Sequence, residues 1–135
     1  MESMNITGGL MPRYVDGFVI PVPKRNLKSY TRMAREAGKI WKKCGALEYC
    51  ECVGDDLNPD MGPFKIATFP GKIKPKRGET IVFSFIVFQS RAHRDRVNAK
   101  VMKDPIMNDP KQKDRPMPFD VRRMLYGGFR VIVDL

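Results

Sequence analysis

One stretch of the chain, Ile81 to Phe88, is apolar at nearly all positions of both alternating sets and is rich in β-branched and aromatic residues. This pattern predicts a strand that is covered on both faces. Ser90 follows in the position of a helix N-cap, and Asp104-Pro105 ends the predicted helix. In so short a chain, helices can cover one face of the strand, and we expect a second copy of the chain to cover the other.

The rest of the chain continues the alternation of strand and helix patterns. Two-residue periodicity and flanking turn residues predict strands over residues 14–21, 46–53 and 124–133. Apolar spacings of three and four predict a helix over residues 26–44, which Gly45 ends. The apolar stripe of this helix comprises Leu27, Tyr30, Ala34, Ala37, Trp41 and Cys44.

Two long connections separate these elements. Residues 54–79 contain several prolines, and a connection of this length usually has structure of its own or a function. Within it, residues 64–69 are expected to form a short extra strand or a flap across a cleft. A second proline-rich connection runs from the end of the second helix to Asp120.

The predicted order is β-α-β, a connection, and β-α-β. It is typical of α+β proteins with the ferredoxin-like fold, an antiparallel βαββαβ sheet with both helices on one face. Strands 14–21 and 81–88 are expected to be adjacent and parallel. On the other sheet face, burying about eight apolar side chains at ~1.5–3 kcal/mol each gives more than ~10 kcal/mol before association entropy is subtracted. We therefore expect a homodimer with its sheets face to face, the dimeric α/β-barrel arrangement.

Composition sets further bounds. The length of 135 residues, with 42% hydrophobic and 30% charged residues, indicates a single soluble domain, expected over residues 13–135. Residues 1–12 have a Gly pair and no periodicity, which predicts a flexible extension and no signal peptide. No apolar run approaches the roughly 18 residues of a membrane span. Three cysteines without an export signal favour reduced thiols and a cytoplasmic protein.

The net charge of +10 raises the question of a nucleic-acid partner. Eight basic residues and the single Glu36 lie between residues 24 and 43, and more basic residues follow at 72–77 and 111–115. A solvated helix face explains these charges, and a phosphate-binding surface is the alternative. The chain has no aromatic RNA-binding strand pattern, G-x-x-G clamp or zinc-finger spacing, so nucleic acid is the less favoured partner.

Six segments occur in a recognisable order: Tyr14-Val-Asp-Gly-Phe-Val19, Gly45-Ala-Leu-Glu-Tyr49, Glu51-Cys-Val-Gly-Asp-Asp56, Ser90-Arg-Ala-His-Arg-Asp95, Val97-Asn-Ala-Lys-Val-Met102 and Tyr126-Gly-Gly-Phe129. Together they resemble the YbaA-like family of small bacterial proteins of unknown function, from about Tyr14 to the C-terminus. The resemblance implies a dimeric α/β-barrel and a bacterial cytoplasmic protein, and it implies no reaction. Residues before Arg13 and around 58–64 are atypical of this family.

Asp16 and His93 are the candidate catalytic residues. Asp16 shares a strand face with Phe18 and Ile20, where a carboxylate needs a partner, and in a cavity its pKa would be raised, as suits a general base. A carboxylate satisfied by an arginine or by backbone amides is the alternative. His93, the only histidine, lies in the first helical turn after the Ser90 cap, where the helix end favours a neutral imidazole. A histidine packed under the sheet and bonded to a backbone carbonyl is the alternative.

Glu48, Glu51, Arg94 and Tyr126 are the candidate ligand-binding residues. Glu48 and Glu51 point to opposite faces of their strand, so only one of them can face a cavity. Tyr126 offers a hydroxyl that would orient a ligand, although an edge-packed tyrosine fits as well. No metal or cofactor is expected, because Cys50-x-Cys52 lacks the spacing and the second pair of a zinc site.

Two functional hypotheses follow. The first is a small-molecule-binding protein or enzyme with its cavity between helices and sheet. The second is a basic, dimeric interaction protein that contacts RNA or another acidic partner. Polar side chains converging in a pocket would favour the first hypothesis, and a continuous basic face without a pocket would favour the second.

Overall fold

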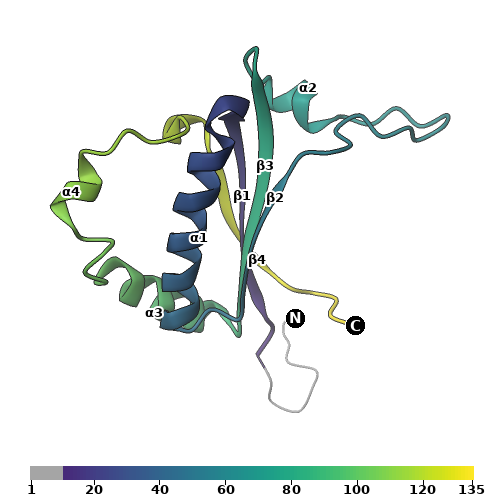
Figure 1. The fold of residues 1–135 in the computed structure, drawn as a ribbon. Coiled ribbons are helices and arrows are strands. Elements are labelled where there is room, and N and C mark those ends of the chain that lie inside the picture. The colour runs from purple at the N-terminus through teal and green to yellow at the C-terminus, as the bar shows by residue number, and fades with distance from the viewer. Residues whose placement is uncertain (1–10) are drawn as a thin grey trace.

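Four antiparallel strands form one sheet, and two long helices cover one of its faces (Figure 1). The computed structural model describes residues 11–135, so most of the extension predicted over residues 1–12 lies outside the described residues. The strands are β1 (Tyr14–Pro23), β2 (Glu48–Val53), β3 (Glu79–Phe88) and β4 (Leu125–Arg130). The helices are α1 (Leu27–Cys44), α2 (Phe69–Ile73), α3 (Arg91–Met102) and α4 (Pro110–Lys113), with 3-10 turns at Lys24–Asn26 and Val121–Arg123.

The strand order is β2-β3-β1-β4, and every neighbouring pair is antiparallel. This order confirms the predicted ferredoxin-like α+β fold. The prediction that the first and third strands are parallel is wrong, because Tyr14 pairs with Phe88 and Ile20 pairs with Val82 in antiparallel register. The α1 crossover makes β2 run in the same direction as β1, and β3 fills the space between them in the opposite direction. The end of β3 therefore delivers the start of α3 to the beginning of β1.

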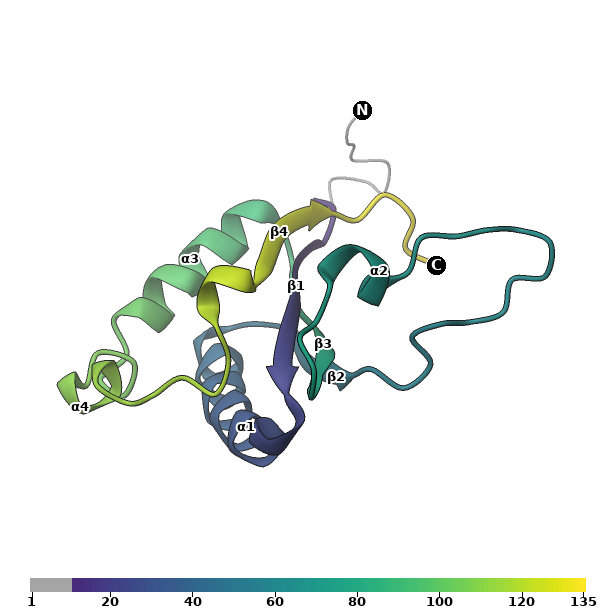
Figure 2. The ribbon, with the colours of Figure 1, turned by 90° about the horizontal axis from the view of Figure 1, so that it is seen from above.

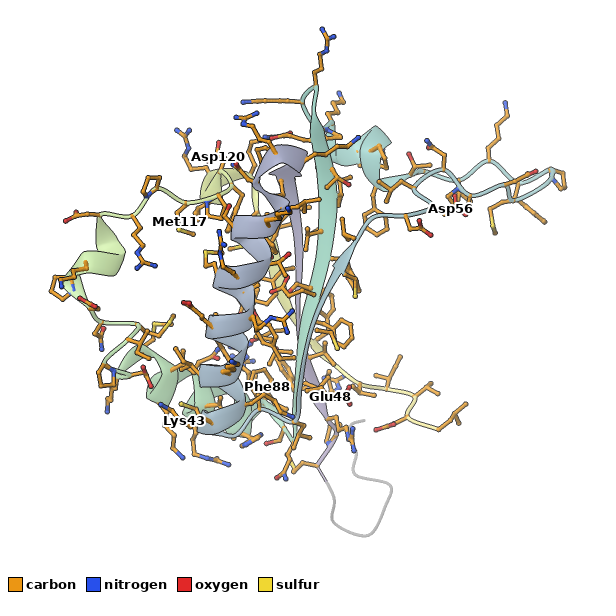
Figure 3. All side chains as sticks on the ribbon, viewed as in Figure 1. Lys43, Glu48, Asp56, Phe88, Met117 and Asp120 are labelled. Atoms are coloured by element: carbon orange, nitrogen blue, oxygen red, sulfur yellow. The ribbon has the colours of Figure 1, made fainter. Side chains whose placement is uncertain are left out.

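Helices α1 and α3 lie side by side over the same sheet face (Figure 2). Phe88, Val97 and Val101 are almost fully buried between α3 and the sheet, and Figure 3 shows Phe88 near the lower end of this layer. Trp41 of α1 donates a hydrogen bond from its indole nitrogen to Asn98 Oδ1 of α3, at 3.0 Å. The apolar stripe predicted for the first helix thus faces the core.

The other sheet face has no helix over most of its surface; we call it the open face. Phe83, Leu125 and Phe129 point from β3 and β4 to this face and are 46%, 56% and 62% exposed. The rings of Phe83 and Phe85 lie 6.0 Å apart on it. β3 is therefore apolar on both faces, as predicted, and the two long helices α1 and α3 cover only one of them.

Residues 64–69 do not form the predicted strand. Thr68 instead caps α2, because its hydroxyl accepts a hydrogen bond from the backbone N–H of Gly71 at 3.1 Å, and Pro70 occupies the first turn. The connection before α2 projects away from the sheet on the side of the open face (Figure 1), so it is no flap over the helix-covered side.

The second connection returns along the helix-covered side. Asp104 ends α3 as predicted, with its carboxylate accepting from the N–H of Ile106 at 2.9 Å and from Lys43 Nζ at 2.7 Å. Asn26 Nδ2 donates to the carbonyl of Pro118 at 2.9 Å and ties the connection to the start of α1. Across residues 11–135, no helix combines the length and the apolar character that a membrane span requires.

Candidate functional site

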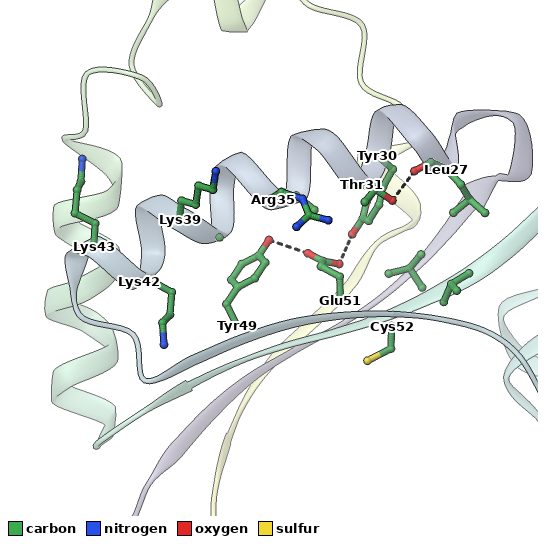
Figure 4. A pocket seen from close by; sticks show the side chains of 14 residues that line it. Leu27, Tyr30, Thr31, Arg35, Lys39, Lys42, Lys43, Tyr49, Glu51 and Cys52 are labelled. Atoms are coloured by element: carbon green, nitrogen blue, oxygen red, sulfur yellow. Dashed lines mark hydrogen bonds between the residues drawn. The ribbon is translucent and has the colours of Figure 1, made fainter.

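A groove of about 850 Å³ runs between α1 and the edge strand β2 (Figure 4). Its floor comes from the residues of α1 that face the sheet and from the residues of β2 that face the helix. These include Leu27, Tyr30, Ala34, Gly38, Tyr49, Glu51 and Val53, and Val82 of β3 adds to the floor. Because β2 is an edge strand with no neighbour beyond it, the groove opens to solvent along its whole side.

Glu51 lies at the centre of this floor. Its Oε1 accepts a hydrogen bond from the Tyr30 hydroxyl and its Oε2 accepts one from the Tyr49 hydroxyl, both at 2.7 Å. Burial, together with the adjacent carboxylate, raises the pKa of both tyrosines above their usual range. Both hydroxyls therefore keep their protons and serve as donors. We call these three residues the Tyr–Glu–Tyr cluster.

Gly38 allows the Tyr49 ring to lie against the backbone of α1. A Cβ added at this position would approach ring atoms of Tyr49 to 2.6 Å, which is closer than real contacts allow. Glycine inside a helix costs ~1 kcal/mol relative to alanine. Glycine at position 38 therefore lowers the helix propensity of α1 and allows the Tyr49 side chain to lie in the groove.

Basic side chains of α1 form the upper rim of the groove. Lys43 pairs with Asp104, and Lys42 Nζ donates to the carbonyl of Leu47 at 2.7 Å. Arg35 and Lys39 stand above the Tyr–Glu–Tyr cluster (Figure 4), and within residues 11–135 no ion pair occupies either of them. The rim thus offers two cationic groups over a floor that is mostly apolar.

A smaller cavity of about 340 Å³ lies on the other side of the Tyr–Glu–Tyr cluster. Tyr30, Ala34, Tyr49 and Glu51 line both spaces. The far wall of the cavity is sulfur-rich and aromatic, with Met33, Met107, Met117, Phe119 and Met124. Met107, Met117 and Met124 thus line a space between α1 and the returning connection.

Asp16, the predicted general base, lies outside both spaces and is only 1% exposed. Its Oδ1 is 3.2 Å from Arg94 Nε, an ion pair whose angles are not those of a hydrogen bond. Arg94 also donates to the Tyr14 hydroxyl at 3.1 Å and lies over the Tyr14 ring. Burial raises the pKa of Asp16, and the positive charge of Arg94 opposes that rise.

Gly128 of β4 makes room for this ion pair. A Cβ at this position would come within 2.5 Å of the Arg94 guanidinium and would also meet the Tyr14 hydroxyl. Tyr126, two residues earlier, is half exposed and stacks on Phe18 with the ring centroids 4.8 Å apart. Gly128 therefore marks a close approach of the β4 backbone to these side chains.

His93 faces a different neighbour from Arg94. Its backbone N–H donates to Ser90 Oγ at 3.0 Å, which confirms the predicted cap, and its Nδ1 accepts from the N–H of Gln89 at 3.0 Å. A Cβ on Gly45 would lie 3.4 Å from its Nε2, so the ring borders the turn after α1. Burial, with the positive charges of Arg96 and Lys100, lowers the pKa of His93.

The six candidate residues thus fall in four places. Asp16, Arg94 and Tyr126 gather around β1 and β4, Glu51 lies in the groove, His93 borders the α1 turn, and Glu48 is exposed on the open face. The two glutamates do point to opposite faces. In residues 11–135 no three histidine, cysteine or acidic side chains cluster as metal ligands, and all three cysteines are free.

Tyr30, Tyr49, Gly38, Arg35 and Lys39 line the groove and were not among the predicted site residues. Gly38 carried a usable signal, because an isolated glycine inside a strong helical pattern often has a packing reason. Tyr30 and Tyr49 carried no such signal in the sequence, since one belongs to a helix stripe and the other to a strand. Only the tertiary fold brings both to Glu51.

Comparison with known proteins yields similarity of sequence and of fold. The model of a family described as "Protein of unknown function (DUF1428)" matches residues 13–121. The chain is 42% identical over 122 residues to the uncharacterized protein YbaA of Escherichia coli K12, across 90% of this chain and 98% of that protein. YbaA of Shigella flexneri matches to the same extent.

One solved structure, described as a dimeric ferredoxin-like protein from an uncultured marine organism, aligns with a TM-score of 0.56. The alignment covers 92% of this chain and 99% of that one, at 10% sequence identity. At so low an identity, the likeness is one of fold.

Proposed function

The chain belongs to the DUF1428 family of proteins of unknown function, as its YbaA-like motifs predicted, and within that family we propose a homodimeric protein that binds a small acidic molecule between α1 and β2. The observation that carries the proposal is the Tyr–Glu–Tyr cluster below Arg35 and Lys39 in an open groove. A ligand-binding groove with an apolar floor and a few convergent polar groups is the usual form of a small-molecule site.

The groove favours a ligand with two kinds of polar group. A carboxylate or phosphate would pair with Arg35 and Lys39 on the rim. An ionised carboxylate has about four acceptor positions, and the two tyrosines use two of those on Glu51, so a ligand hydroxyl or amino group can donate to the others. The ligand class is therefore a small amino or hydroxy acid whose carbon skeleton packs on the apolar floor.

The open face supports the homodimer. Phe83, Leu125 and Phe129 would be covered if two sheets packed face to face, and exposed apolar patches of this kind commonly mark interfaces. Light scattering at micromolar concentration should give twice the chain mass. A monomer with the same fold would contradict this part of the proposal.

The alternative, a basic interaction protein, uses the same α1 side chains without the groove. The groove itself favours the small-molecule function, because Glu51 and the two tyrosine hydroxyls converge in a recess and do not form a continuous basic face. A catalytic role for Asp16 and His93 stays a hypothesis, and no contact in the groove depends on either residue.

Calorimetry with a set of amino and hydroxy acids, at 150 mM salt, tests the proposal. Arg35→Ala and Glu51→Gln should each weaken binding about 10-fold to 100-fold, because each loses one charge-assisted hydrogen bond. Arg32→Ala, one turn away on α1 and outside the groove, is the matched control and should bind as the parent does. Tight RNA binding that both Arg32→Ala and Arg35→Ala weaken would favour the alternative.

A further inference from the structure

Residues 54–68, which we call the arm, leave the sheet after β2 and project beyond the open face (Figures 1 and 2). The arm contains no helix or strand. Its base is held by the N–H of Gly54, which donates to the carbonyl of Ile81 at 2.8 Å. Farther out it has local bonds, from Phe64 N to the Met61 carbonyl and from Gly62 N to Asp60 Oδ1.

The outer part of the arm carries large apolar side chains in solvent. Met61, Phe64 and Ile66 are 48%, 72% and 46% exposed. At the base, a small apolar groove of about 230 Å³ continues onto the open face and is lined by Val19, Val53, Leu57, Phe69, Ile81 and Phe83. The apolar surface of the open face therefore continues to the base of the arm, and the outer apolar side chains project beyond it on the side where a second copy would lie.

The charge of the arm is opposite to that of the remaining chain. Asp55, Asp56 and Asp60 precede its first basic residue, Lys65, and Figure 3 shows Asp56 on the projecting segment. The arm thus carries a formal charge of −2 while the whole chain carries +10, which leaves +12 on the other residues. The rest of a second copy of the chain therefore carries a net charge opposite to that of the arm.

We propose that each arm clasps the second copy of the chain, with its aspartates on basic side chains of that copy and its three apolar side chains covered by the contact. This inference rests on the homodimer of the proposed function and assigns the arm as part of its interface. Apolar contact supplies affinity, and the charges supply orientation and a salt-dependent association.

Sedimentation velocity of the full chain tests the clasp. The triple variant Met61→Ser/Phe64→Ser/Ile66→Ser should raise the dimer dissociation constant at least tenfold. The matched control is Met102→Ser/Ile106→Ser/Val121→Ser, whose original side chains are 57%, 53% and 48% exposed on the helix-covered side. The control should leave the dissociation constant unchanged, and all six residues are exposed enough for both variants to fold.

A second variant tests the charges. Asp55→Asn/Asp56→Asn/Asp60→Asn should weaken the dimer at low salt, and the difference from the parent should shrink at high salt. Equal dissociation constants for the apolar arm variant and its control, with the parent dimeric, would overturn the clasp and leave the dimer standing. A monomeric parent would overturn both the clasp and the dimer.

Discussion

The carboxylates of Asp16 and Glu51 both face the helix-covered side of the sheet, but different groups surround them. Asp16, on central strand β1, is shut in by Arg94, Tyr14 and the close backbone of Gly128. Glu51, on edge strand β2, is bonded by two neutral hydroxyls and borders an open groove. A charge neutralises the first carboxylate, and only hydrogen bonds stabilise the second.

The position of the strand in the sheet explains this difference. On the helix-covered face, a side chain of a central strand has strands on both sides and helices over it, so a polar group there is satisfied by the protein itself. An edge strand leaves one side to solvent and to ligands. Asp16, whose carboxylate stands out among apolar neighbours in the sequence, is therefore enclosed by the protein. Glu51, whose strand has no unusual pattern, is the carboxylate that a ligand can reach.

Arg94→Ala should give the largest effect. It leaves Asp16 buried without a counter-charge, and removing one partner of a buried pair costs about 3–5 kcal/mol of unfolding free energy. Urea unfolding at pH 7 measures it. Arg96→Ala, exposed on the same helix, should change stability by less than ~0.5 kcal/mol. A similarly small cost for Arg94→Ala would show that water reaches Asp16 and would remove the contrast with Glu51.

Gly38→Ala should have an intermediate effect. Although alanine favours a helix by ~1 kcal/mol, the new Cβ would meet the Tyr49 ring, and overpacking typically costs about 1–3 kcal/mol. The variant should also weaken ligand binding, because Tyr49 must move away from Glu51. Thermal unfolding and calorimetry on the same samples separate the two effects. A stabilised variant with unchanged binding would show that the ring has room to yield.

The smallest expected effect is that the stability contributions of Asp16 and Asp104 change in opposite directions with pH. The pKa of Asp16 is raised, chiefly by burial, so stability falls as pH rises from 3.8 through the raised folded value. The cost of Asp16→Asn should therefore be greatest near pH 3.5 and smaller at pH 7. The pKa of Asp104 is lowered, chiefly by its bond from Lys43, so the stability it contributes is present above 3.8 and is lost as pH falls through the lowered folded value.

Asp104→Asn should accordingly cost most at pH 7 and least near pH 3. Urea unfolding of both variants across this range gives the two slopes. Slopes of the same sign would mean that attraction to Arg94 outweighs the burial of Asp16, and Asp16 would then be an ordinary stabilised ion pair.

Elements with a strong local pattern were predictable. The apolar run of β3, the Ser90 cap and Gly45 at the end of α1, with φ of 123°, all depend on neighbours in sequence. The relative direction of β1 and β3 does not depend on neighbours in sequence. It follows from the α1 crossover, which leaves a space between β1 and β2 that β3 fills. If β1 and β3 were parallel, the start of α3 would lie away from Asp16. The antiparallel register instead places Arg94 of α3 beside Asp16.

The site was less predictable than the fold. Glu51 was named as a candidate from its strand alternation, but its partners Tyr30 and Tyr49 come from two different elements. The projecting direction of the arm also had no local signal, since its prolines and aspartates are typical of any long connection. Contacts between distant residues are set by packing, which a single sequence does not display.

The place of β1 between β3 and β4 has a consequence during synthesis on the ribosome. The first strand to emerge is central, and its residue Tyr14 pairs with Arg130, near the end of the chain. At ~5–20 residues per second, translation delivers β4 roughly ten seconds after β1. Throughout that interval β1 has at least one unpaired edge, which is open to pairing with other chains until β4 is made.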